Sequence, residues 1–126
     1  MVTPMNTTSH MAVGVDLPFV TVERLRRHFR EKYLLKQPQV DLMLQSSAQS
    51  LEHGLERLAA SAGCQELIGV YHGLKGLFLN MGEGAWADYV REIEGRLKNG
   101  EELDHLAIAE VLRQGVAEVL FLLEVK

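Results

Sequence analysis

The stretch QVDLMLQSSAQSLEHGLERLAAS, residues 39–61, decides the fold class of this chain. Its apolar residues follow one another in alternating steps of four and three, which places them along one face of an α-helix. Such a seam is typical of helices that pack lengthwise against other helices. We therefore predict a long helix over residues 39–61 whose buried seam consists of Leu44, Ala48, Leu51, Leu55, Leu58 and Ala62.

Helical spacing continues on both sides of this stretch. Three helices are predicted after it, over residues 64–81, 85–98 and 101–124. Glycines and the Asn99-Gly100 pair interrupt the pattern between them. The inner side of the last helix is expected to consist of Leu106, Ala109, Leu112, Val116, Val119 and Leu123. A shorter amphipathic helix is predicted before the stretch, from the N-cap Thr21 to about Tyr33.

The predicted elements indicate an all-α protein. No segment alternates as a β-strand does, and the connections between the helices are short. We expect an antiparallel four-helix bundle over residues 37–126. Residues 1–36 are expected to supply an N-terminal arm and an additional short N-terminal helix that caps the bundle, so that the chain forms a single compact domain.

Composition narrows the class of protein. The chain has 126 residues, of which 47% are hydrophobic and 24% charged, as in an ordinary soluble domain. Its one cysteine, Cys64, excludes a disulfide framework and a cysteine zinc site, and favours a reducing, cytoplasmic setting. The net charge of −4 argues against a nucleic-acid partner, and no apolar run is long enough for a membrane span. We expect a cytoplasmic monomer with no metal site.

The predicted helix over residues 64–81 contradicts ordinary helix propensity. Gly69, Gly73 and Gly76 all fall inside it, and each costs roughly 0.5–1 kcal/mol relative to alanine. An exposed position for His72 accounts for this composition. On a helical wheel His72 lies almost opposite the apolar residues of the helix, and its imidazole is expected to face solvent.

The neighbours of His72 indicate a chemistry for the ring. Gly69 and Gly76 lie beside it on one side, and Ile68, Lys75 and Leu79 on the other. An exposed neutral imidazole is a nucleophile near pH 7, since its ordinary pKa is about 6.5. The glycines leave room for a partner's active site, the lysine offers positive charge to an anion on the ring, and the two apolar residues offer a docking patch. This combination predicts a histidine that accepts and donates a phosphoryl group.

The run His72-x-Leu74-Lys75-Gly76, followed by Gly82, resembles the motif of the histidine-containing phosphotransfer domains of multistep two-component relays. The resemblance covers residues 72–82 in motif and roughly residues 39–124 in architecture. It implies that His72 is the phosphorylated residue, that Lys75 stabilises the phosphoryl group, and that Gly76 keeps the surface open for the partner. Gly82 matches the later glycine of the motif, to which we assign a structural role.

The resemblance also implies partners. Such a domain takes a phosphoryl group from the aspartyl phosphate of a receiver domain and passes it to a second receiver in a relay that includes a hybrid or sensor histidine kinase. The receiver supplies Mg²⁺, so no cofactor is expected on this chain. The sequence contains no nucleotide-binding signature, and the chain is therefore expected to be a phosphoryl carrier without kinase activity of its own. The expected docking face consists of Ile68, Gly69, Gly73, Gly76 and Leu79.

Departures from the motif keep other hypotheses open. Gly73, Leu77 and Phe78 differ from the family's usual residues, although the wheel places the last two in the core. A second hypothesis is a non-phosphorylated helical module that binds a receiver or kinase and blocks it. A third is the phosphotransfer domain cut from a chemotaxis-type histidine kinase. A purely structural interpretation is that the glycines allow close helix packing and His72 is an ordinary surface histidine.

Other polar residues are interpreted as surface charge. We expect His53 and His105 to lie on polar faces of their helices. Four carboxylates are expected to be solvated rather than to form a hydrolytic pair, namely Glu92, Glu94, Glu101 and Glu102.

Overall fold

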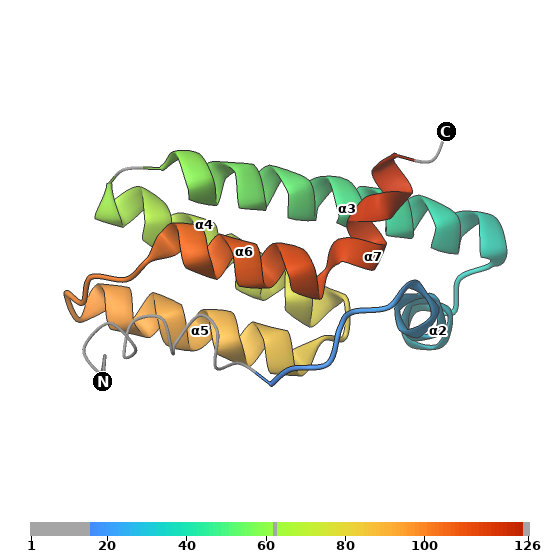
Figure 1. Ribbon diagram of the computed structural model, residues 1–126. Coiled ribbons are helices and arrows are strands. Elements are labelled where there is room, and N and C mark those ends of the chain that lie inside the picture. Colours follow the sequence, from blue (N-terminus) through green and yellow to red (C-terminus); the bar gives the residue numbers. More distant parts are fainter. Residues whose placement is uncertain (1–15, 62, 125–126) are drawn as a thin grey trace.

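The computed structural model describes residues 16–61 and 63–124, and the predicted N-terminal arm lies largely outside these residues. The described part of the chain is all-helical and contains no β-strand, which confirms the prediction of an all-α protein (Figure 1). The helices are α2 (Val22–Tyr33), α3 (Gln37–Ala60), α4 (Cys64–Asn80), α5 (Gly84–Lys98), α6 (His105–Gly115) and α7 (Ala117–Leu120), followed by the 3₁₀ helix η1 (Phe121–Leu123).

Helices α3, α4, α5 and α6 run across the view in Figure 1 in roughly parallel lines, whereas α2 is seen almost end-on. The most extensive contact is between α4 and α5, and α3 packs against α4, α2 and α6. The α3 seam has the predicted composition, because Leu44, Ala48, Leu51, Leu55 and Leu58 are all buried. Ala62, the last predicted seam residue, lies outside the described residues.

The predicted last helix, over residues 101–124, is wrong in its extent. The helix begins only at His105, where the Asp104 side chain accepts a hydrogen bond from the Ala107 amide, and it is interrupted at Val116. The Gly115 carbonyl accepts a hydrogen bond from the amide of Val20 instead of continuing the helix. Helix α7 and η1 follow as separate short elements.

The side of the last helix that faces the core also differs from the prediction. Leu106 was expected on the inner side but is 68% exposed, whereas Ile108 is buried. Ile108 and Leu112, one turn apart, lie on the buried face of α6, and Leu106 lies away from it.

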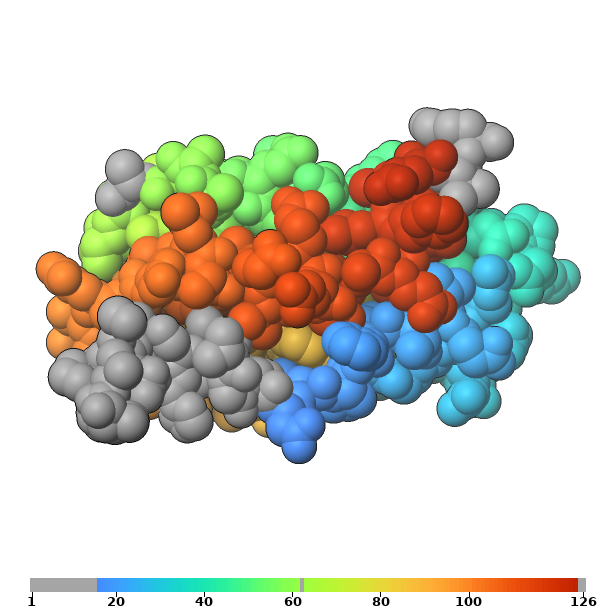
Figure 2. All heavy atoms as spheres, viewed as in Figure 1, coloured from blue at the N-terminus to red at the C-terminus, as the bar shows by residue number. Residues whose placement is uncertain are grey.

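The segment before α2 lies against the C-terminal half of the protein. Besides the bond from Val20 to α6, the Trp86 indole donates a hydrogen bond to the carbonyl of Pro18 at 2.8 Å, and the Val22 amide donates one to Glu118. Figure 2 shows this segment, in blue, against the atoms of α6 and α7 in orange and red. Leu25 of α2 is fully buried in the same core as the other helices.

Helix α2 also holds the turn that ends α4. Arg24 makes a bidentate ion pair with Glu83, whose side chain is only 5% exposed, with two N···O distances of 2.9 Å. The ring of His28 lies against Gly82 and contacts the carbonyl of Asn80 through Nε2 at 3.2 Å. The end of α4 is therefore fixed from outside the helix that carries His72.

Candidate functional site

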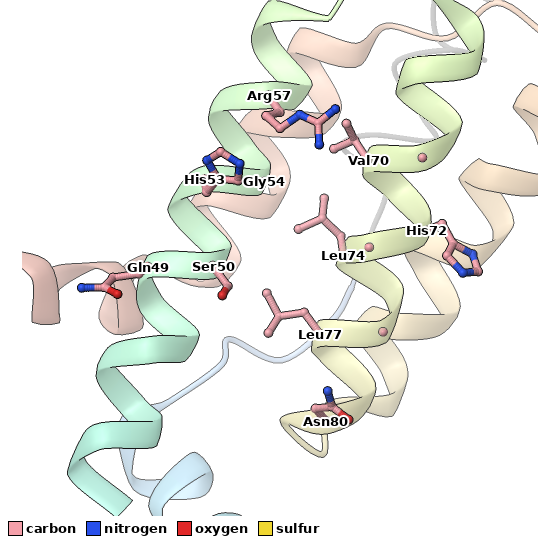
Figure 3. Close-up of a pocket in the computed structure, with 13 residues that line it drawn as sticks. Gln49, Ser50, His53, Gly54, Arg57, Val70, His72, Leu74, Leu77 and Asn80 are labelled. Atoms are coloured by element: carbon pink, nitrogen blue, oxygen red, sulfur yellow. The ribbon is translucent and has the colours of Figure 1, made fainter.

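His72 lies in the middle of α4 with a side chain that is 68% exposed. The buried side of the same helix carries Tyr71, Leu74 and Phe78. In Figure 3 the imidazole projects away from α3. The structure thus confirms that this histidine is exposed. A partner can therefore reach the ring.

The three glycines of α4 are not packing glycines. A Cβ atom added to Gly69, Gly73 or Gly76 would meet nothing within 4 Å. By contrast, Gly54 of the neighbouring helix α3 is a packing glycine, because a Cβ there would lie 2.8 Å from Leu74 Cδ2. The purely structural interpretation of the α4 glycines is therefore wrong, and their cost in helix propensity is not offset by contacts within the described chain.

A groove of about 670 Å³ lies between α3 and α4 beside these glycines (Figure 3). Leu74 and Leu77 of α4 point into it, and His53 and Arg57 of α3 line its other side. His72 lies at its edge. Leu77 was expected in the core with Phe78, but only Phe78 is buried, because Leu77 faces the groove.

Lys75 lies one turn after His72, as expected, and forms an ion pair that the sequence analysis did not predict. Its Nζ is 3.2 Å from Oε1 of Glu94 on α5. The other oxygen of this carboxylate, Oε2, lies 3.2 Å from Nδ1 of His72 and 3.2 Å from Nζ of Lys98. One carboxylate thus contacts the histidine and two lysines.

The interpretation of Glu94 as solvated charge is wrong. Its side chain is only 5% exposed, in contrast to Glu92, which is 59% exposed. A signal was present in the sequence, because Glu94 follows the buried Val90 by four residues and therefore lies on the inner side of α5. What the sequence could not show is that two residues of α4 lie opposite this position.

Glu94 stays ionised at neutral pH. Burial acts to raise the pKa of its carboxyl group, but contacts with Lys98, Lys75 and His72 outweigh burial, and the pKa is lowered from its ordinary value. A charged carboxylate only accepts hydrogen bonds, so Nδ1 of His72 is the ring nitrogen that carries a proton in this contact. In the neutral ring, Nε2 then keeps its lone pair.

The remaining predicted site residues differ in their exposure. Leu79 is 57% exposed on the His72 side of α4, whereas Ile68 is partly buried against the core. Gly82 has a φ of +76°, and a Cβ at this position would lie 2.5 Å from the His28 ring. Its structural role is thus to adopt the positive φ of the turn after α4 and to leave room for the His28 ring of α2.

A second histidine contact was missed. His105 is half-buried at the start of α6, and its Nδ1 lies 2.8 Å from the hydroxyl of the fully buried Tyr71. Burial lowers the pKa of His105, and the nearby Asp104 opposes this effect only in part. This pair lies on the core side of α4 and does not contact His72.

No group of His, Cys, Asp and Glu residues suited to a metal ion occurs within residues 16–61 and 63–124. Across the same residues, no helix combines the length and the apolar character that a membrane crossing requires. Comparisons of the chain with models of protein families, with curated proteins and with solved structures found no match.

Proposed function

We propose that this protein is a phosphoryl carrier of the histidine phosphotransfer type. The single observation that carries the proposal is the exposed His72 whose Nδ1 lies 3.2 Å from the buried carboxylate of Glu94. Under this proposal α3, α4, α5 and α6 form an antiparallel four-helix bundle, and α2 is the additional helix at its end.

The proposed reaction uses the lone pair on Nε2 of His72. Nε2 attacks the phosphorus of an aspartyl phosphate in line, the N–P bond forms, and the P–O bond to the aspartyl carboxylate breaks with its electron pair leaving on that oxygen. The ring then carries positive charge with its proton still on Nδ1, and the Glu94 carboxylate offsets that charge. The reverse steps pass the phosphoryl group to a second receiver domain.

Lys75 and the open glycine side support the proposal in different ways. The ammonium group of Lys75 is close to the ring because both contact the Glu94 carboxylate, and its side chain is partly exposed. The bare backbone at Gly73 and Gly76 leaves space for the acidic pocket and the Mg²⁺ of a receiver domain to approach the ring. We place the partner's docking contacts along the groove between α3 and α4 and on the exposed Leu79.

The partners are accordingly receiver domains of response regulators and of hybrid or sensor histidine kinases. The protein itself is proposed to be a cytoplasmic monomer that neither binds ATP nor phosphorylates itself. Phosphoryl flow then depends on which receivers fit the surface around His72.

The test is phosphoryl transfer from a panel of phosphorylated receiver domains in the presence of Mg²⁺. We expect wild-type protein to gain an acid-labile, base-stable label, and His72→Gln to gain none. His53→Gln is the matched control, because His53 is an exposed histidine that lines the same groove from α3. Absence of label on wild-type protein with every receiver contradicts the proposal.

The groove favours one other function, a module that binds a receiver or kinase without being phosphorylated. Its apolar side at Leu74 and Leu77 and its polar side at His53 and Arg57 would bind a partner whether or not His72 reacts. The same panel separates the two functions. A receiver that binds wild-type protein and His72→Gln equally, and labels neither, supports the binding module.

A further inference from the structure

The surroundings of His72 contain a second cation that is not part of the motif over residues 72–82. Lys98 reaches the site from the last turn of α5, four residues after Glu94. Its Nζ and the Nδ1 of His72 each lie 3.2 Å from the same oxygen, Glu94 Oε2, so the two nitrogens are at most twice that distance apart. The side chain of Lys98 is 59% exposed and is free to change its conformation.

The charges at this site leave an excess of positive charge that an additional anion can use. Lys75 and Lys98 bring two positive charges to one buried carboxylate, which leaves an excess of positive charge beside the neutral ring. A phosphoryl group adds nearly two negative charges at pH 7. It would lie beside the Glu94 carboxylate. Without Lys98, only Lys75 and the positively charged ring would then offset both anions at this site.

The contact of Lys75 with Glu94 is also incomplete as a hydrogen bond. Glu94 Oε1 is buried and, among the described residues, accepts no aligned hydrogen bond, although Lys75 Nζ lies 3.2 Å away. The contact of Lys75 is therefore an ion pair that can be exchanged for contacts with phosphoryl oxygens, and Lys98, whose side chain is largely exposed, pairs with the other oxygen, Oε2.

From this arrangement we infer that Lys98 is a second phosphoryl-binding residue, and that Glu94 holds both lysines beside the ring until His72 is phosphorylated. The inference rests on the proposed function. It adds a residue from α5 to a site that the motif places on α4 alone. Phosphorylation is expected to move the ammonium groups of Lys75 and Lys98 from the carboxylate toward the phosphoryl oxygens.

The test uses phosphohistidine made without a partner protein. Phosphoramidate, a small phosphoryl donor, transfers its phosphoryl group to Nε2 of the imidazole as its own P–N bond breaks and ammonia leaves. The pKa of the phosphoryl group is then followed by ³¹P NMR, because a cation in contact with the phosphoryl oxygens favours their dianionic form. We expect Lys98→Met to raise that pKa by about half a unit.

Two further variants distinguish direct contact of Lys98 with the phosphoryl group from other effects of Lys98→Met on the phosphoryl pKa. Arg91→Met is the matched control, because Arg91 is an exposed cation of α5 that pairs with Asp88 and not with Glu94. We expect it to move the phosphoryl pKa by less than half as much as Lys98→Met. The second variant repeats Lys98→Met in a Glu94→Gln background, where the shift should persist if Lys98 contacts the phosphoryl group itself.

The inference is overturned if Lys98→Met and Arg91→Met give equal shifts, or if the shift vanishes in the Glu94→Gln background. The second result would mean that Lys98 acts only by pairing with Glu94. In either case phosphoramidate has still phosphorylated His72, and the proposed function is tested separately by transfer from the receiver domains. Failure of phosphoramidate and of every receiver to label His72 overturns both.

Discussion

His72 and Glu94 lie on adjacent helices and contact each other through Nδ1 and Oε2 at 3.2 Å, although one side chain is 68% exposed and the other 5%. The contact therefore joins a reactive surface group to an anchored charge beneath it. Helices α4 and α5, which carry these two side chains, make the most extensive helix contact of the structure. The same carboxylate affects stability as well as chemistry.

Glu94→Gln is expected to make the stability of the protein less dependent on acidic pH. The pKa of Glu94 is lowered in the folded protein, so its stabilising contribution is complete above the ordinary value of 4.5 and is lost as pH falls through the folded value. We expect a loss of about 1 kcal/mol in the free energy of unfolding at pH 7, and a smaller loss at pH 3. Urea unfolding at both pH values measures this difference.

Glu92→Gln is the control for this prediction. Glu92 pairs with Arg96 on the exposed side of α5, and its removal should change stability by less than about 0.5 kcal/mol at either pH. Equal effects of the two substitutions at pH 7 would show that Glu94 is not the anchored charge that its burial indicates.

Gly82→Ala is expected to destabilise the protein by about 2–4 kcal/mol. Its positive φ disfavours any side chain, and a Cβ would also overlap the ring of His28. Gly100 also has a positive φ, but a Cβ there would meet nothing within 4 Å, so Gly100→Ala should cost only about 1 kcal/mol. Chemical denaturation of both variants isolates the effect of the His28 contact.

The contact can also be relieved directly. In a His28→Ala background, Gly82→Ala should cost no more than Gly100→Ala does in wild-type protein. A cost that stays at its full value would mean that the ring of His28 is not what restricts this turn.

The features of the structure that were predicted correctly depend only on residues close to one another in the sequence. The α3 seam and the exposure of His72 both follow from helical periodicity alone, because local spacing decides which face of a helix is apolar. The start of α4 at Cys64 and its end near Gly82 likewise follow from local glycine signals.

Features that depend on distant parts of the chain could not be predicted. At the interruption after α6 the Gly115 carbonyl bonds to the amide of Val20, which is far away in the sequence. The ring of Trp86 also lies where a side chain at position 115 would be, so this position requires glycine. The ion pair of Glu94 with Lys75 joins two different helices. Periodicity reports which face is apolar but not which helix covers it, and it therefore misses polar groups that meet across an interface.

The pair of Tyr71 and His105 is expected to make stability depend on pH in a second range. Burial lowers the pKa of His105 from its ordinary value of 6.5, so stability is complete above 6.5 and falls as pH decreases through the folded value. Neutral Nδ1 can accept the Tyr71 hydroxyl hydrogen, but imidazolium cannot. Urea unfolding should show a smaller loss of stability between pH 7.5 and 5.5 for His105→Gln than for wild-type protein.

The hydroxyl of Tyr71 gives an independent measure of the same contact. Tyr71→Phe should cost about 1 kcal/mol at pH 7.5 and less at pH 5.5, because the hydrogen bond is already weakened when His105 is protonated. Parallel pH profiles for wild-type protein and His105→Gln would contradict the assignment of this pair.

Gly76→Ala is expected to stabilise the protein while it impairs phosphoryl transfer. Nothing in the described chain contacts a Cβ at Gly76, so alanine should gain about 0.5–1 kcal/mol from helix propensity. The added methyl group would nevertheless lie one turn from His72, on the side left open for a receiver.

Gly95→Ala is the matched control, because Gly95 is an exposed glycine within α5 whose Cβ would likewise meet nothing within 4 Å. Denaturation should show similar stabilisation of both variants, and transfer from a receiver should be slowed only in Gly76→Ala. Equal transfer rates would mean that no partner uses the space beside Gly76, whereas a loss of stability in Gly76→Ala would mean that the glycine is needed by the fold itself.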